Sequence, residues 1–251
     1  MPSIVCSYIG VHQMFQLALA AQEMGALQHL YCSMVDLPGK WGALLARLHR
    51  TAAMLPVGVT SIEETKITEI PLPLLSRRLH GWLYGNKPSD YFESNEWFDR
   101  SVARRLANHS GGIFVGAETC AQHSLAMARR LGMTCVLDCP GIPSQFLAEQ
   151  VAQAAEELRI TVPTASLSSR MLERKAAELD LADAILLCSE FQRDCFVQQG
   201  IDGAKLHVNP LWADSVFFLE AAIDYTATPT RTAGPLRALF VGGGSVAKGA
   251  P

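Results

Sequence analysis

Short apolar runs alternate along the chain with longer segments whose apolar residues recur every three or four positions. The short runs predict strands, and the longer segments predict helices that bury one face. We expect Gly25 to end the first helix, and Pro71 and Pro73 to close the third strand. The predicted strands cover residues 3–8, 27–34, 67–72, 112–115, 135–138, 185–188 and 206–209. The predicted helices cover residues 15–24, 91–109, 121–131, 146–158, 168–182 and 190–199, with Trp97, Val102 and Leu106 on the buried face of the second.

The regular alternation of strand and helix predicts an α/β fold with a doubly wound, mostly parallel sheet of the Rossmann type. Sheets of this kind bind their ligands outside the carboxyl ends of the strands. The loops that follow strands are therefore the places where we expect the chemistry of this protein.

The composition changes near residue 220. Residues 1–220 are expected to form the α/β domain, and residues 221–235, rich in Thr, Ala and Pro, to form a linker. Residues 236–251 begin with a strand pattern and a glycine loop, but they are too few to build a core of their own. We therefore expect a piece of a longer two-domain protein, with its second domain truncated.

Composition and charge argue against nucleic acid, a membrane span, disulfides and a metal site. The 251 residues carry 21 Lys and Arg against 24 Asp and Glu, a net charge of −3, which disfavours nucleic acid as a partner. No run approaches the ~18 apolar residues of a membrane span, and no signal-peptide pattern opens the chain. Seven scattered Cys form no C-x-x-C pair, and the histidines show no metal-ligand spacing. These patterns predict reduced core thiols, no metal site and a cytoplasmic location.

A glycine loop follows the strand pattern at 236–241. Glycines let the backbone N–H groups approach an anion, and Lys248 adds a positive charge, so the loop is suited to phosphate. Gly242–Ala247 also fits the dinucleotide fingerprint G-x-G-x-x-A. An ordinary strand-to-helix turn would explain the same glycines. Lys248 is followed by Gly249 instead of Ser or Thr, which excludes a Walker loop.

Several short motifs occur in a fixed order in the second half of the chain. They are E-x-x-x-A-D at Glu178–Asp183, Ser189-Glu190-Phe191, K-x-x-V-x-P at Lys205–Pro210, Asp214-Ser-Val-Phe217, Phe240-Val241-Gly242 and Lys248-Gly249. The series resembles the family 4 glycosyltransferases, which have the GT-B architecture of two Rossmann-like domains. Further likeness lies near the N-terminus, at Gly10-Val-His-Gln13, and at 132–138.

The resemblance implies transfer of a sugar, with retention, from a nucleotide-sugar co-substrate to a saccharide or lipid-linked acceptor, in polysaccharide biosynthesis and without a further cofactor. It assigns the acceptor mainly to the N-terminal domain and the donor phosphates to Gly242, Gly243, Lys248 and Gly249. Gly243 stands where an arginine is common in the family, so one positive charge is missing. The E-x7-E element that holds the donor sugar would follow Pro251, and we expect the chain to be inactive alone.

Loops after three predicted strands supply the candidate acceptor residues. Gly10, His12 and Gln13 follow the first strand, Glu118 follows the fourth, and Asp138 ends the fifth. In the family such loops approach the acceptor and the donor phosphates. The same residues would also serve as ordinary structure, with His12 capping a helix and Glu118 opening a solvated one.

Residues 40–55 place Trp41 and several leucines near one face, with Lys40, Arg47 and Arg50 beside it. A helix packed on the sheet shows this pattern, and so does a surface helix that contacts anionic lipid at the inner membrane face. Arg77 and Arg78 add a little to the second interpretation.

Other functions remain open at this point. A noncatalytic remnant would keep only the α/β scaffold as a binding module. A nicotinamide-dependent oxidoreductase would use the Gly242–Ala247 fingerprint, although such fingerprints usually follow the first strand of their domain. A sugar-nucleotide epimerase shares the GT-B fold.

Overall fold

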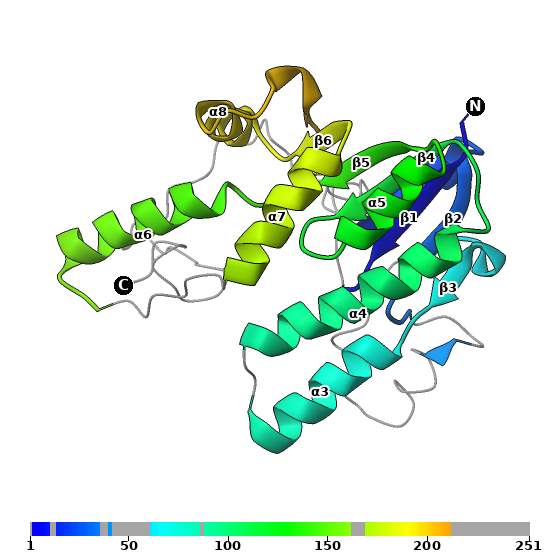
Figure 1. Ribbon diagram of the computed structural model, residues 1–251, viewed down its shortest axis with the longest axis horizontal. Coiled ribbons are helices and arrows are strands. Elements are labelled where there is room, and N and C mark those ends of the chain that lie inside the picture. The colour runs from blue at the N-terminus through cyan, green and yellow to red at the C-terminus, as the bar shows by residue number, and fades with distance from the viewer. Residues whose placement is uncertain are drawn as a thin grey trace, which may run out of the picture. The chain divides into compact units, whose positions relative to one another are not determined.

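The computed structural model in Figure 1 describes residues 2–10, 14–35, 40–41, 61–85, 88–161 and 169–211. The chain splits into two compact units, Met1–Ser144 with Ser166–Asn209, and Gln145–Ala165 with Pro210–Pro251. The first unit contains the sheet and the helices that cover it. Most of the described part of the second unit lies in helix α6 (Ser144–Leu158), which buries none of its residues. The expected linker and second domain lie outside the described residues.

The sheet has seven strands, all parallel, in the order β3-β2-β1-β4-β5-β6-β7. The order runs outward in both directions from β1 and β4, so this is a doubly wound α/β fold of the Rossmann type, as the sequence predicts. The strands are β1 (Ile4–Tyr8), β2 (Leu27–Cys32), β3 (Ile67–Glu69), β4 (Ile113–Ala117), β5 (Thr134–Asp138), β6 (Ala184–Leu187) and β7 (Leu206–Val208). The α-helices besides α6 are α1 (Met14–Glu23), α3 (Leu72–Tyr84), α4 (Pro88–Leu106), α5 (Gln122–Arg130), α7 (Ser169–Leu181) and α8 (Glu190–Gln198), and two 3₁₀ turns are η3 (Glu64–Lys66) and η4 (Gly203–Lys205).

All seven predicted strands are present, and each predicted helix matches one in the structure to within a few residues. Gly25 follows α1 with φ = 68°, a left-handed conformation that glycine adopts without cost. The prediction for residues 67–72 is wrong at its end, because β3 stops at Glu69 and Leu72 begins a helix. Helix α3 is missing from the prediction because Pro73 was interpreted as a stop. Proline is tolerated in the first turn of a helix, where its missing N–H has no partner to lose.

Helix α4 buries Val102 and Leu106 as predicted, but the third residue of its buried face is Phe98 instead of Trp97. Phe98, Val102 and Leu106, spaced four residues apart, are completely buried, whereas Trp97 is 42% exposed. Four-residue spacing keeps side chains on one side of a helix, and Trp97 lies a quarter turn away from that row. Figure 1 shows α4, α5 and α7 side by side in front of the sheet, with α3 outside α4.

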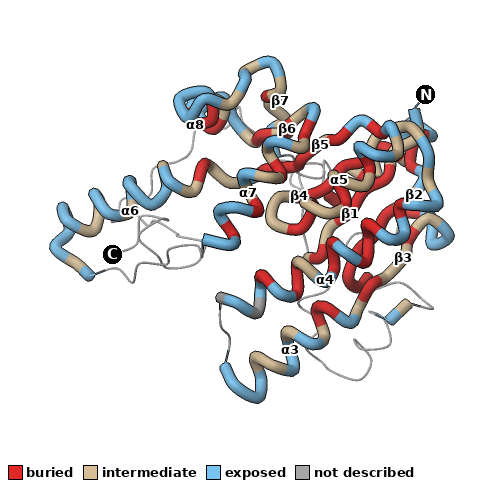
Figure 2. Tube along the Cα trace, viewed as in Figure 1, coloured by how far each residue is buried: buried red, intermediate tan, exposed pale blue. Residues whose placement is uncertain are grey.

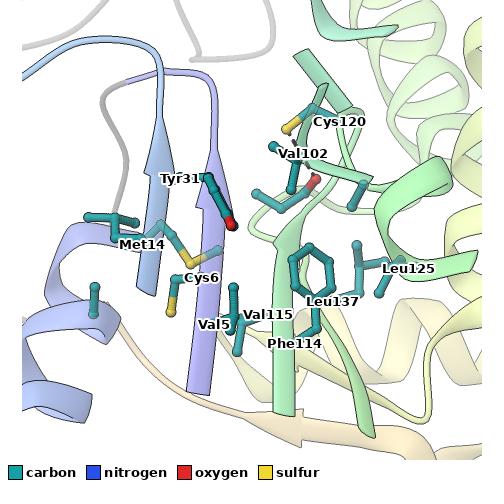
Figure 3. Packing of buried hydrophobic residues seen from close by; sticks show 14 of the residues in the cluster. Val5, Cys6, Met14, Tyr31, Val102, Phe114, Val115, Cys120, Leu125 and Leu137 are labelled. Atoms are coloured by element: carbon teal, nitrogen blue, oxygen red, sulfur yellow. Dashed lines mark hydrogen bonds between the residues drawn. The ribbon is translucent and has the colours of Figure 1, made fainter. Parts of the chain in front are cut away.

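The core lies between these helices and the sheet. Figure 3 shows Phe114 of β4 and Leu137 of β5 beside Leu125 of α5, with Cys6 and Met14 across the sheet from them. All seven cysteines are free and six of them are buried, as predicted. Burial raises the pKa of Cys6 to about 12, so this thiol stays protonated at neutral pH. Among the described helices, none has the length and apolar character needed to cross a membrane.

Candidate functional site at the carboxyl edge of the sheet

The strand order places the candidate site at β1 and β4. These two strands are neighbours, with Ser7 opposite Gly116. After β1 the chain continues to β2, toward one edge of the sheet, and after β4 it continues to β5, toward the other edge. Such a reversal opens a crevice at the carboxyl ends of the two strands, where doubly wound sheets bind ligands. Three of the predicted residues come to this edge: Gly10 after β1, Glu118 after β4, and Asp138 at the end of β5.

Glu118 forms an ion pair at this edge. One of its carboxylate oxygens lies 2.8 Å from Nζ of Lys175 on α7, and both side chains are about 15% exposed. Lys175 Nζ also donates a hydrogen bond to Ser144 Oγ at 3.0 Å. Glu118 is therefore held in a fixed position with part of its carboxylate open to solvent, and it is neither a helix cap nor a freely solvated residue.

Asp138 lies deeper than Glu118. Its side chain is completely buried, while its carbonyl oxygen accepts a hydrogen bond from Glu118 N at 2.9 Å. Its place in the fold is thus under the loop that presents Glu118. The roles predicted for Glu118 and Asp138 in acceptor binding remain predictions. His12, Gln13, Gly242, Gly243, Lys248 and Gly249 lie outside the described residues.

Two further polar side chains reach this edge. Tyr8 ends β1, and burial raises its pKa to about 12, with the negative charges near it adding to the effect and Arg77 opposing it. A Cβ atom on Gly10 would lie 3.1 Å from the Tyr8 ring, so the glycine allows the chain to pass close to that ring. Arg77 of α3 stacks over the Tyr91 ring at 4.4 Å. The sequence suggested Arg77 only for contact with anionic lipid, and its place at this edge was not predicted because the helix that carries it was missed.

The N-terminus of α5, next to this crevice, is already occupied by carboxylates from other helices. Asp99 of α4 accepts hydrogen bonds from His123 N at 2.7 Å and from Ser124 N at 2.9 Å. Glu178 of α7 accepts from Thr119 N at 2.7 Å and from Ala121 N at 2.9 Å. These carboxylates thus take N–H groups at the start of α5 that could otherwise bind an anion such as phosphate.

Arg174 binds the carboxylates together. Its side chain is 1% exposed; Nη1 donates to Thr119 O at 2.8 Å, and Nη2 donates to Glu96 and lies 3.4 Å from Asp99 Oδ2. Burial raises the pKa of Glu178 to about 7, although Arg174 and the two backbone N–H groups act in the opposite direction. Thr119, at φ = 75°, sits in the middle of these contacts, so the network fixes the backbone directly after Glu118.

The motifs that carry the family resemblance have structural contacts in this fold. Asp183 accepts a hydrogen bond from Cys135 N at 2.8 Å, and Lys205 Nζ donates to Ala182 O at 3.0 Å just after α7 ends. Ser189 is the N-cap of α8 and accepts from Gln192 N at 3.2 Å. Together with Glu178, these residues join β5, α7, β6 and β7. The described part of the series therefore specifies the scaffold and not a reactive group.

Gln192 fixes the loop that follows β5. Its amide nitrogen donates to Cys139 O and to Gly141 O, both at 2.6 Å, and its oxygen accepts from Cys188 N at 2.7 Å. Because Glu118 packs 3.3 Å from the Cβ position of Gly141, this loop forms one wall beside the Glu118–Lys175 pair. Within the described ranges, no three His, Cys, Asp or Glu side chains are grouped so that they could hold a metal ion.

Comparisons with known proteins give likeness in fold alone. No protein-family model matches the sequence, and no curated protein matches it. Solved structures that resemble it include a UDP-glucosyltransferase of Polygonum tinctorium capable of glucosylating indoxyl, with 12% identity and a TM-score of 0.39 over 86% of this chain and 53% of that one. Another is UGT89C1 of Arabidopsis thaliana complexed with UDP-L-rhamnose, with 11% identity and a TM-score of 0.44 over 83% and 48% of the two chains. The chain thus spans about half the length of the structures that it resembles.

Proposed function

We propose that the chain is the acceptor-binding half of a glycosyltransferase that takes its sugar from a nucleotide-sugar donor. The observation that carries the proposal is the Glu118–Lys175 pair at the carboxyl edge of β4, beside the point where the strand order reverses. A carboxylate and an ammonium group in fixed positions are suited to the hydroxyl groups of a saccharide, because one accepts and the other donates hydrogen bonds. The acceptor is a saccharide or a lipid-linked saccharide.

The occupied N-terminus of α5 supports a separate site for the donor. A doubly wound sheet offers helix N-termini at its carboxyl edge for phosphate, but here Asp99 and Glu178 already take the N–H groups. The donor diphosphate therefore needs an anion site other than the start of α5. The family resemblance assigns it to the loop Gly242–Gly249, where Lys248 supplies the charge.

In this proposal the residues of the sheet edge orient the acceptor and do not form bonds to the sugar. Arg174 and Glu178 hold the backbone at Thr119, which positions Glu118, and Gln192 holds the opposite wall of the site. The transfer proceeds with retention at the sugar carbon, as in the family that the sequence resembles.

Isothermal titration calorimetry on the full chain tests the donor half of the proposal. We expect saturable binding of a UDP-, GDP- or ADP-sugar, at least tenfold weaker in Lys248→Ala and unchanged in the control Lys205→Ala. Lys205 is matched in charge but holds a helix end on the scaffold. Binding of NAD without binding of any nucleotide sugar would favour an oxidoreductase instead, and no binding of either would refute donor binding by this chain.

A further inference from the structure

Helix α3 carries an apolar surface that faces solvent. Leu72, Leu79, Trp82 and Leu83 are between 52% and 81% exposed, the highest value being that of Trp82. Figure 2 shows most of this helix exposed or half-buried, in contrast to the neighbouring α4. Large apolar side chains that gather on one exposed surface indicate a contact with a partner or a membrane.

The four side chains form one stripe. At 100° per residue they fall within an arc of about 100° on the helix, and the buried Pro73 and Leu74 lie on the opposite side. The helix therefore packs through its other face and turns its apolar stripe outward, which is the reverse of an ordinary surface helix.

The charges on α3 identify the partner. The helix contains Arg77 and Arg78 but no Asp or Glu, and Arg78 is exposed next to the stripe. The stripe itself includes Trp82, a residue type that favours the boundary between water and lipid. A helix with an apolar stripe, an interfacial Trp and an adjacent Arg matches an anionic lipid surface.

A second copy of the chain is a poorer partner for the same stripe. Face-to-face packing of two α3 helices would bring their arginines together, and the helix has no carboxylate to offset the repulsion. An anionic bilayer supplies the missing negative charge and the apolar environment at once.

We propose that α3 docks on anionic lipid membranes, lying in the plane of the interface with Leu79, Trp82 and Leu83 in the acyl boundary and Arg78 among the headgroups. The inference does not depend on the proposed transferase activity. The segment 40–55, which the sequence suggested for lipid contact, lies outside the described residues apart from Lys40 and Trp41.

Vesicle flotation with the full chain tests the proposal. We expect the chain to float with phosphatidylglycerol-containing vesicles and to stay behind with pure phosphatidylcholine. The double variant Trp82→Ser/Leu83→Ser should partition at least about tenfold less, since both apolar anchors are lost. Arg78→Glu should lower partitioning into the anionic vesicles at least about fivefold, because one basic residue near an anionic surface contributes ~1 kcal/mol.

Two controls keep the test specific. Trp97→Ser removes another partly exposed Trp, and Arg193→Glu reverses another surface charge, both outside α3. Both should float like the unmodified chain. Equal binding of all variants, or binding of none of them, would refute docking through α3. Analytical sedimentation provides a further outcome. If the chain forms a dimer that only the Trp82→Ser/Leu83→Ser variant loses, and no variant binds vesicles, the stripe binds a second copy of the chain instead.

Discussion

The buried arginine of α7 gives the sharpest test of the structure. Replacing Arg174 by Met keeps most of the side-chain volume but removes the guanidinium that contacts Glu96, Asp99 and Thr119 O. Asp99 is completely buried, so its charge would lose its partner without gaining water. The loop at Thr119 would also lose one of the bonds that hold it.

The expected cost follows from the burial. Breaking a buried ion pair from one side costs ~3–5 kcal/mol, a figure that already includes the charge left behind. A domain of this size is stabilised by only ~5–15 kcal/mol, so the variant should lose a large part of its stability. Arg174→Lys should lose less, since a single ammonium keeps the charge but cannot make all of the contacts of the guanidinium.

Equilibrium urea unfolding, followed by circular dichroism, measures these differences. Arg170 provides a matched control one turn earlier on α7: it pairs with Glu93 at 3.0 Å, but both side chains are more than 60% exposed. Arg170→Met should therefore cost at most ~1 kcal/mol. If Arg174→Met and Arg170→Met unfold at the same urea concentration, the buried network does not hold the fold together as described.

Three further changes probe the same unit by urea unfolding. Gly116→Ala places a Cβ 2.6 Å from the Ala121 Cβ, so it should lower the free energy of unfolding by ~1–3 kcal/mol. In the control Gly203→Ala the nearest atoms to the new Cβ are 3.7 Å away, and the loss should be less than half as large. Equal losses would contradict the close approach of β4 and the start of α5. The raised pKa of Glu178, about 7, means that the folded state binds its proton more tightly than the unfolded chain. The contribution of Glu178 to stability should thus fall by about 3 kcal/mol as the pH rises from 4.5 to 7, and the difference in stability between the unmodified chain and Glu178→Gln should change by that amount over the same range. The contribution of His29 has the opposite sign, because burial lowers its pKa to about 4. The stability of the unmodified chain relative to His29→Gln should therefore fall as the pH drops from 6.5 to 4, and a constant difference would contradict the burial of this ring.

The strands were predictable because parallel strands buried on both faces are short apolar runs, and the helices between them keep a regular period. Helix α3 was missed for two reasons. The proline in its first turn was interpreted as the end of the preceding strand and not as the start of a helix. The exposed face of the helix is apolar, so the sequence lacks the polar outer face by which a surface helix is recognised. Trp97 was wrongly grouped on one helix face with Val102 and Leu106, from which it is turned by more than ~100°. Phe98, four residues before Val102, shares their face and is buried with them.

The site was predictable only in its location. The sequence placed Glu118 after one strand and Asp138 at the end of another, and the strand order then brings both to one edge. No local pattern pairs Glu118 with Lys175, 57 positions further along the chain, or directs Glu178 to the start of α5. Such contacts depend on how the helices pack, which a single sequence does not specify. The motif Glu178–Asp183 was noticed for its family resemblance, and its contacts give it a structural meaning as well.

Saturation-transfer NMR with a panel of saccharides tests the central claim, that the edge at Glu118 binds an acceptor. The account predicts transfer to at least one saccharide by the full chain, lost in Glu118→Gln and retained in Glu190→Gln, a control that changes an exposed carboxylate after β6. Equal transfer in both variants, or none in the unmodified chain, would contradict an acceptor site at this edge.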